Sequence, residues 1–147
     1  MKEKIFKEVQ LIINERISSA KEAMDRAQES ANSEGKSSAG DKYETSRAMG
    51  QIDRDMYARQ LVNAQNESAI LQNIDITKLS LSVGLGTLVN TSLGYFFVSV
   101  SIGKIEIEGM SITVVSSNSP IGMVLKGKQV GDKFLFMGRE VVIVSLE

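Results

Sequence analysis

Two carboxylates three residues apart are the side chains of this sequence best placed to do chemistry. Asp41 and Glu44 lie in the segment 37–47, which reads SSAGDKYETSR and separates two long helical patterns. At the beginning of a helix this spacing puts both acids on neighbouring positions of one face. Carboxylate oxygens are the ligands that a hard cation such as Mg²⁺ prefers. The pair is therefore a candidate for holding a metal ion at an exposed turn.

The same two residues also have a purely structural interpretation. Asp41 after Gly40 is a suitable N-cap, and Glu44 three residues later completes the pattern of a capping box. Acidic groups in a first turn also suit the helix dipole. Both roles are compatible, because capping would leave the outer carboxylate oxygens facing solvent.

The composition excludes several other kinds of chemistry. The 147 residues include no cysteine and no histidine, so disulfides, thiolate zinc sites, cysteine nucleophiles and Ser-His-Asp hydrolysis are all ruled out. With 17 basic and 18 acidic side chains the net charge is −1, which gives no bulk attraction to nucleic acid or anionic membrane. No apolar run is long enough to cross a bilayer, and no signal-peptide core follows the N-terminus. We expect a cytoplasmic protein.

Two long helices must position the acidic pair. The spacing of apolar and small residues predicts one helix from Lys2 to about Ala31 and a second from Lys42 to about Ile74. Neither is apolar enough to stand alone, so we expect an antiparallel pair that turns at the acids and brings Met24 near Ile52 and Ala20 near Met56. The first helix offers Val9, Ile13, Ile17, Ala20, Met24, Ala27 and Ala31 to the contact, and the second offers Met49, Ile52, Met56, Val62, Ile70 and Ile74.

The second half of the chain has the alternation of strands. It predicts strands at 87–90, 95–101, 104–108, 111–116, 133–137 and 140–145. A short helix has Ser119 as its N-cap, Pro120 at its first position and Gly127 just past its end. The predicted fold is therefore α+β. Residues 1–77 form an antiparallel coiled-coil hairpin with an acidic tip near 37–45, and residues 78–147 form a small antiparallel β-domain with one short helix.

Two stretches together resemble the bacterial Gre transcript-cleavage factors. Ser119-Pro120-Ile121-Gly122, followed by Leu125-Lys126-Gly127-Lys128-Gln129-Val130-Gly131-Asp132, is similar to the family's Ser-Pro-Leu-Gly…Leu-x-Gly-Lys-x-Val-Gly-Asp signature. Gly40-Asp41-Lys42-Tyr43-Glu44 is similar to its Gly-Asp-Leu-x-Glu tip. The resemblance implies that the β-domain is FKBP-like. Lys42 and Thr45 depart from the Leu and Asn that the family usually has at these places.

The resemblance also implies a function. Such a factor binds the secondary channel of bacterial RNA polymerase and stimulates cleavage of backtracked RNA. Asp41 and Glu44 would be accessory ligands of a Mg²⁺ shared with the polymerase, and the isolated chain would bind no cofactor tightly and would not itself be an enzyme. Weaker contacts to polymerase or RNA would come from Lys42, Tyr43, Arg47 and Arg54. We expect a monomer that touches nascent RNA only indirectly.

Three alternatives remain at this stage. The first is a secondary-channel regulator of the same architecture that does not stimulate cleavage, which the departures at Lys42 and Thr45 favour. The second is a peptidyl-prolyl isomerase, which needs an aromatic-lined pocket that a chain with 5% aromatic residues can hardly supply. The third is a coiled-coil oligomer or adaptor. Arg47 and Arg54, with Asp53 and Asp55 beside them, also fit a solvated mixed-charge face.

Overall fold

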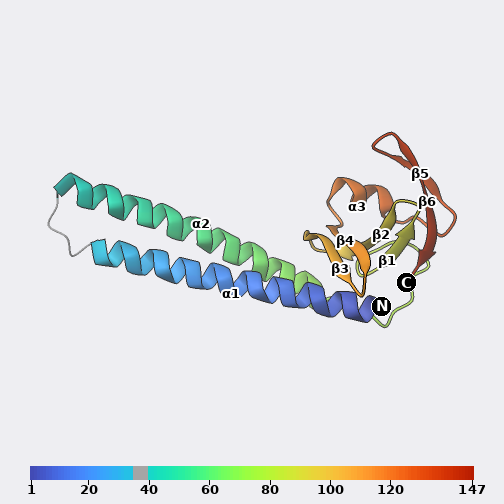
Figure 1. The fold of residues 1–147 in the computed structure, drawn as a ribbon, viewed down its shortest axis with the longest axis horizontal. Helices are drawn as coiled ribbons and strands as arrows, with labels where there is room; N and C mark the ends of the chain where they lie inside the picture. Colours follow the sequence, from blue (N-terminus) through green and yellow to red (C-terminus); the bar gives the residue numbers. More distant parts are fainter. Residues whose placement is uncertain (35–39) are drawn as a thin grey trace. The chain divides into compact units, whose positions relative to one another are not determined.

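Two long helices come first in the chain, and six strands with one short helix follow (Figure 1). The computed structural model describes residues 1–34 and 40–147, without the side chains of residues 33–43. The helices are α1 (Lys2–Glu34), α2 (Gly40–Gln72) and α3 (Pro120–Leu125). The strands are β1 (Leu88–Thr91), β2 (Gly94–Ser99), β3 (Gly103–Ile107), β4 (Met110–Ser116), β5 (Lys133–Phe136) and β6 (Arg139–Leu146). The predicted α+β class is confirmed.

The chain divides into two compact units that do not follow the change from helix to strand. One unit, called the β unit here, consists of Met1–Gln10 and Ala69–Glu147. The other, the helical unit, consists of Leu11–Ser68. The first turns of α1 and the last residues of α2 therefore belong with the sheet. The boundary expected near residue 77 marks where the element type changes, and it stays a prediction.

The inward face of α1 agrees with the apolar pattern read from the sequence. Within the helical unit Ile13, Ala20 and Ala31 are buried. Ile17, Met24 and Ala27, which complete the predicted stripe, are half-buried. Because these positions recur every three or four residues, α1 presents one continuous face to its partner.

The predicted inward face of α2 is wrong in the helical unit. Met49 and Ile52 are 62% and 65% exposed, and Met56 and Val62 also face solvent. Positions with reduced exposure include one row that recurs in steps of four and three, made by Gly50, Arg54, Tyr57, Leu61, Ala64 and Ser68. The reason is steric, because small residues such as Gly50 let the two backbones approach where the larger Met and Ile side chains would hold them apart.

The pairing of the two helices also differs from the expected register. Arg16 Nη1 lies 3.3 Å from Glu67 Oε2, and Ala31 packs against Gly50. Ala20 is therefore level with the region of Ala64, about two turns further along α2 than the predicted partner Met56. The expected contact of Met24 with Ile52 is wrong for the same reason.

The β unit is built on a six-stranded sheet with the order β3-β4-β2-β1-β6-β5. All neighbouring strands are antiparallel except β2 and β4, which pair in parallel with Phe97 opposite Val114. The predicted all-antiparallel sheet is thus corrected at one pair. The cause is the path of β3, which lies outside β4 and returns the chain so that β4 runs in the direction of β2. The strand positions read from the sequence agree within two residues.

Successive residues of β2 face opposite sides of the sheet, and both sides are buried. Val98 belongs to a core made by Val83, Val89, Val115, Ile121, Leu125, Phe134, Val141 and Ile143. Phe97 points to the other side and is completely buried, while Tyr95 and Phe96 are half-buried. The expectation that part of the Tyr95-Phe96-Phe97 run is core is confirmed.

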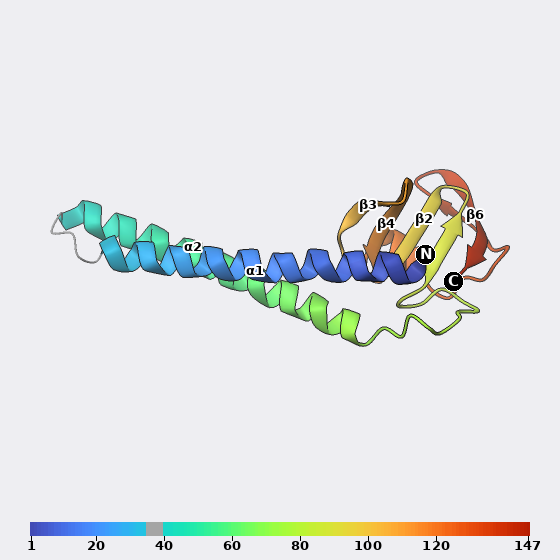
Figure 2. The same ribbon diagram turned by 60° about the horizontal axis from the view of Figure 1, so that its bottom comes forward.

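The first turns of α1 lie beside the sheet in both views (Figures 1 and 2). Ile5 and Val9 are completely buried, and Lys4 forms an ion pair with Glu108 in the turn between β3 and β4. Lys2 is 5% exposed, and its Nζ donates a hydrogen bond to the Lys78 carbonyl at 3.1 Å. Burial lowers the pKa of the Lys2 amine below its ordinary value, and the charges of Glu147 and Asp75 oppose this effect. Nothing in the sequence pattern signalled a buried lysine.

The Ser119-Pro120-Ile121-Gly122 motif forms the start of α3, as predicted. Ser119 Oγ accepts a hydrogen bond from the Gly122 amide at 3.0 Å and donates one to the Ser116 carbonyl at 2.7 Å. The hydroxyl therefore caps α3 and ties it to the end of β4. A Cβ atom on Gly122 would lie only 2.1 Å from the Ser116 carbonyl oxygen, so this position admits no side chain.

Replacing this glycine should destabilise the β unit. In Gly122→Ala the new methyl group meets a backbone oxygen that cannot rotate away, and we expect unfolding to be easier by about 1–3 kcal/mol or more. Gly84→Ala is the matched control, since a Cβ there meets nothing within 4 Å and its φ is not positive. Thermal unfolding followed by near-UV circular dichroism checks both. Equal midpoints for the two variants would contradict this account of the motif.

Candidate functional site

The acidic pair lies at the beginning of α2. The helix begins at Gly40, so Asp41 and Glu44 occupy consecutive turns on one side of its beginning. Glu44 is exposed. The side chains of Asp41, Lys42 and Tyr43 lie outside the described residues, so the roles assigned to them stay predictions. Because helix α2 already includes Gly40, Asp41 lies inside the first turn rather than before it, where a capping residue would be.

The beginning of a helix affects the anionic groups placed there. The unpaired amides of a helix beginning favour negative charge, so two acids are tolerated close together there. The chain enters the β unit at Ala69, 28 residues beyond Asp41. At about 1.5 Å per residue, the segment 41–69 of α2 is itself roughly 40 Å long.

The arginines near the acidic pair sit in a mixed-charge surface. Arg47 is exposed, and Arg54 Nη1 lies 3.6 Å from Asp55 Oδ1. An ion pair at the surface contributes little to stability, but it does reduce the positive charge that Arg54 offers to a partner. The structure thus agrees with the solvated mixed-charge interpretation for Arg54, and a role for Arg47 in binding stays a prediction.

The two helices are in close contact near the acidic end. A Cβ placed on Gly50 would lie 3.0 Å from the Cβ of Ala31. This contact holds the end of α1 against the second turn beyond the acids. Sequence reasoning missed it because Gly50 was not counted as part of an inward row, although the steps to Arg54, Tyr57, Leu61 and Ala64 were visible.

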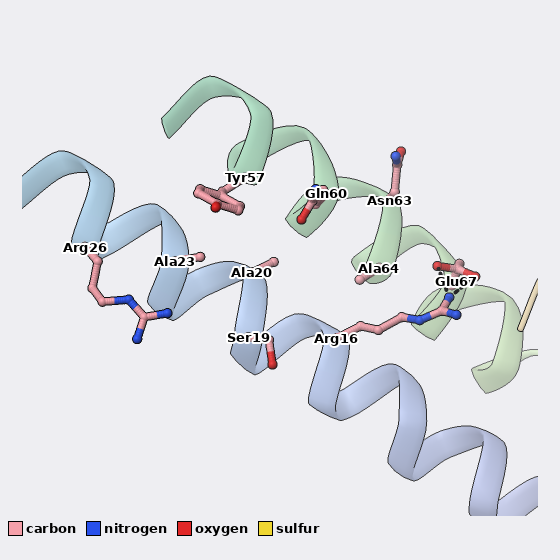
Figure 3. Close-up of a pocket in the computed structure, with 10 residues that line it drawn as sticks. All are labelled: Arg16, Ser19, Ala20, Ala23, Arg26, Tyr57, Gln60, Asn63, Ala64 and Glu67. Carbon is pink, nitrogen blue, oxygen red and sulfur yellow. Dashed lines mark hydrogen bonds and ion pairs between the residues drawn. The ribbon is translucent and has the colours of Figure 1, made fainter. Parts of the chain in front are cut away.

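Further along the helical unit a groove of about 560 Å³ opens between the helices (Figure 3). Alanine side chains point into it from both helices, and the Tyr57 ring lies between them. Arg16 reaches across to Glu67 at one end. The lining residues are Arg16, Ser19, Ala20, Ala23, Arg26, Tyr57, Gln60, Asn63, Ala64 and Glu67. The groove exists because three alanines stand where larger side chains would fill the space.

The described residues form no complete metal site. No group of three or more acidic side chains suitable for holding a metal occurs in the part of the chain with described side chains. Asp41 and Glu44 have oxygen donors of the right chemistry for Mg²⁺, but they supply only two carboxylates.

A cavity of about 230 Å³ in the β unit bears on the prolyl-isomerase alternative. It is lined by Val83, Gly84, Leu85, Val98, Ser117, Gly122 and Lys126. None of these residues is aromatic, whereas an isomerase pocket of the type considered needs aromatic walls. This observation disfavours that alternative.

In the described part of the chain, no helix has both the length and the apolar character needed to span a membrane.

Comparison with known proteins gives one structural similarity. No family model matches the sequence, and no curated protein matches it. A solved structure of the transcription factor Gfh1 aligns with 97% of this chain and 91% of its own chain, at a TM-score of 0.36 and 16% sequence identity. Similarity at this level leaves the function to be argued from the residues themselves.

The close approach of α1 and α2 predicts the effect of enlarging Gly50. In Gly50→Leu the side chain must displace Ala31, so we expect the helices to separate near the acidic end. Amide hydrogen exchange should quicken by at least about tenfold in residues 24–32 and 46–56, which corresponds to roughly 1.4 kcal/mol of local opening. Gly50→Ala is the control, because its tight contact is offset by about 1 kcal/mol of better helix propensity. Unchanged exchange in the Leu variant would contradict the packing described.

Proposed function

We propose that this chain is an accessory factor of bacterial RNA polymerase that carries Asp41 and Glu44 through the secondary channel to the catalytic centre. The observation that carries the proposal is the position of the two acids at the beginning of α2, in a helical pair whose members are each 33 residues long. The resemblance of the tip and of the Ser119–Asp132 stretch to the Gre factors supports the same function. The β unit would remain outside and bind the channel rim.

The chain contributes position rather than a complete catalytic site. Asp41 and Glu44 would hold a Mg²⁺ together with polymerase ligands, and such an ion polarises a water for attack on the RNA phosphodiester. The packed helices restrict where the carboxylates can lie, which lowers the entropy lost when the site assembles. On its own the chain hydrolyses nothing in this proposal, since two carboxylates without further ligands bind Mg²⁺ weakly.

The alternative within the same proposal is a regulator that occupies the channel without stimulating cleavage. Lys42 and Thr45 favour it. A lysine beside the acids competes with Mg²⁺ for their carboxylates, and a threonine would hydrogen-bond Glu44 more weakly than an asparagine. Both versions require binding to polymerase. They differ in whether the carboxylates are used for a metal.

A cleavage assay on polymerase stalled in a backtracked complex tests the proposal. The wild-type chain should shorten the labelled RNA faster than polymerase alone. The double variant Asp41→Asn, Glu44→Gln keeps side-chain size but removes both charges, and the stimulated rate should fall at least about tenfold. Removing even a residue that only hydrogen-bonds to a metal ligand typically lowers metal affinity or activity about 10- to 100-fold.

The control is another pair of acids at the same spacing, both of them exposed. Glu22 and Asp25 lie three residues apart on α1, and Glu22→Gln, Asp25→Asn should leave the stimulated rate unchanged. Binding to core polymerase, measured separately by co-sedimentation, distinguishes the versions. If the wild-type chain binds polymerase but does not stimulate cleavage, only the regulator version of the proposal survives. Absence of binding would end the proposal altogether.

A further inference from the structure

One face of α2 carries two features that the fold of the chain does not use. Six residues follow one another there in steps of three or four, so they form a single continuous row along the helix. In order they are Met49, Ile52, Met56, Gln60, Asn63 and Glu67. The first three make an apolar ridge, and the last three line the groove of Figure 3.

The apolar ridge is exposed in the helical unit. Met49 and Ile52 are 62% and 65% exposed, and Met56 is 36% exposed. Their spacing of three and four is that of a helix that places its side chains into a groove of a partner. The inward row that includes Gly50 makes the contact with α1, so the ridge has no counterpart among the residues whose side chains the structure describes.

The groove has the shape and the lining to receive a ridge of large apolar side chains. Its floor is made by Ala20, Ala23 and Ala64, which point into the space between the helices and leave it open (Figure 3). A floor of small side chains admits larger ones from outside. The Tyr57 ring gives the groove an aromatic wall against which a methionine can pack.

We propose that the helical unit pairs with a second copy of itself in an antiparallel, two-fold arrangement. The ridge of each copy enters the groove of the other, and the two-fold axis passes near Met56 and Gln60. Because ridge and groove are consecutive halves of one row, one antiparallel placement satisfies both contacts at once, as an isologous interface requires. This goes beyond the proposed function and departs from the monomer expected from the sequence.

The charges on this face are arranged in agreement with that pairing. Asp53 is exposed beside the ridge, and the groove has Arg26 at one end and the Arg16–Glu67 pair at the other. With the ridge centred in the groove, Asp53 of one copy lies between the two arginines of the other. A second copy therefore supplies opposite charge as well as apolar side chains.

The size of the surface indicates a reversible dimer. The row extends over 18 residue steps from Met49 to Glu67, or about 27 Å. Three side chains bury less than the roughly 800 Å² per partner of a stable interface, and only the doubled contact, with ridge and groove each used twice, approaches it. We expect dissociation in about the micromolar range.

Sedimentation equilibrium of the full chain tests the pairing. The wild type should move from monomer to twice the monomer mass as its concentration rises. The variant Met49→Gln, Ile52→Gln, Met56→Gln removes the ridge with residues that suit a helix, and it should dimerise at least about tenfold more weakly. Val62→Gln is the matched control, since Val62 is 53% exposed but lies about a third of a turn around α2 from Met56, and it should dimerise normally.

A charge exchange separates this arrangement from general stickiness. Asp53→Arg alone and Arg26→Asp alone should each weaken the dimer, and the double variant should restore it at least in part. Far-UV circular dichroism establishes that each variant keeps its helices. A wild type that stays monomeric, a ridge variant that dimerises normally, or a double variant no better than the singles would overturn the proposal. So would a monomer whose ridge variant loses only polymerase binding, because the partner would then be the occupant of the ridge.

Discussion

The close approach of two helices through small residues is the constraint on which the helical unit depends. Gly50 and Ala31 meet so closely that a methyl group on Gly50 would lie only 3.0 Å from the Ala31 Cβ, and Ala20 and Ala64 are buried further along. A seam of small residues gives up the hydrophobic stabilisation that larger side chains would provide, at about 25 cal/mol for each Å² of apolar surface. In return the helices lie close enough for the register to be fixed by steric fit and by the Arg16–Glu67 pair.

This choice of seam explains the rest of the surface of α2. Because Gly50, Tyr57 and Ala64 face inward, the helix turns Met49, Ile52 and Met56 outward. The same small side chains leave the groove between the helices open. The exposed ridge and the groove thus both result from packing through small residues. Neither feature depends on the acids at the beginning of α2.

Sequence reasoning recovered the elements more completely than the contacts between them. Strand positions and the capped start of α3 were predictable, because alternation, Ser119, Pro120 and Gly127 are local signals. The inward face of α2 was not, since apolar size pointed to Met49 and Ile52 whereas steric fit selected Gly50 and Ala64. The parallel pairing of β2 with β4 and the burial of Lys2 depend on where distant segments meet, which no local pattern encodes. Of the candidate site, the position of Asp41 and Glu44 along α2 was predictable, and the groove was not.

The β unit is assembled from both extremes of the chain. It includes Met1–Gln10, and β1 pairs with β6. Glu147, which follows β6, exchanges two backbone hydrogen bonds of 2.9 Å with Leu88 of β1. The helical unit, in contrast, is continuous in sequence. During synthesis the helical unit can therefore form as soon as it leaves the ribosome, while the sheet must wait for its final strand. Until then β1 has an unpaired edge, and the nascent chain is most exposed to misassembly in the interval between the two events.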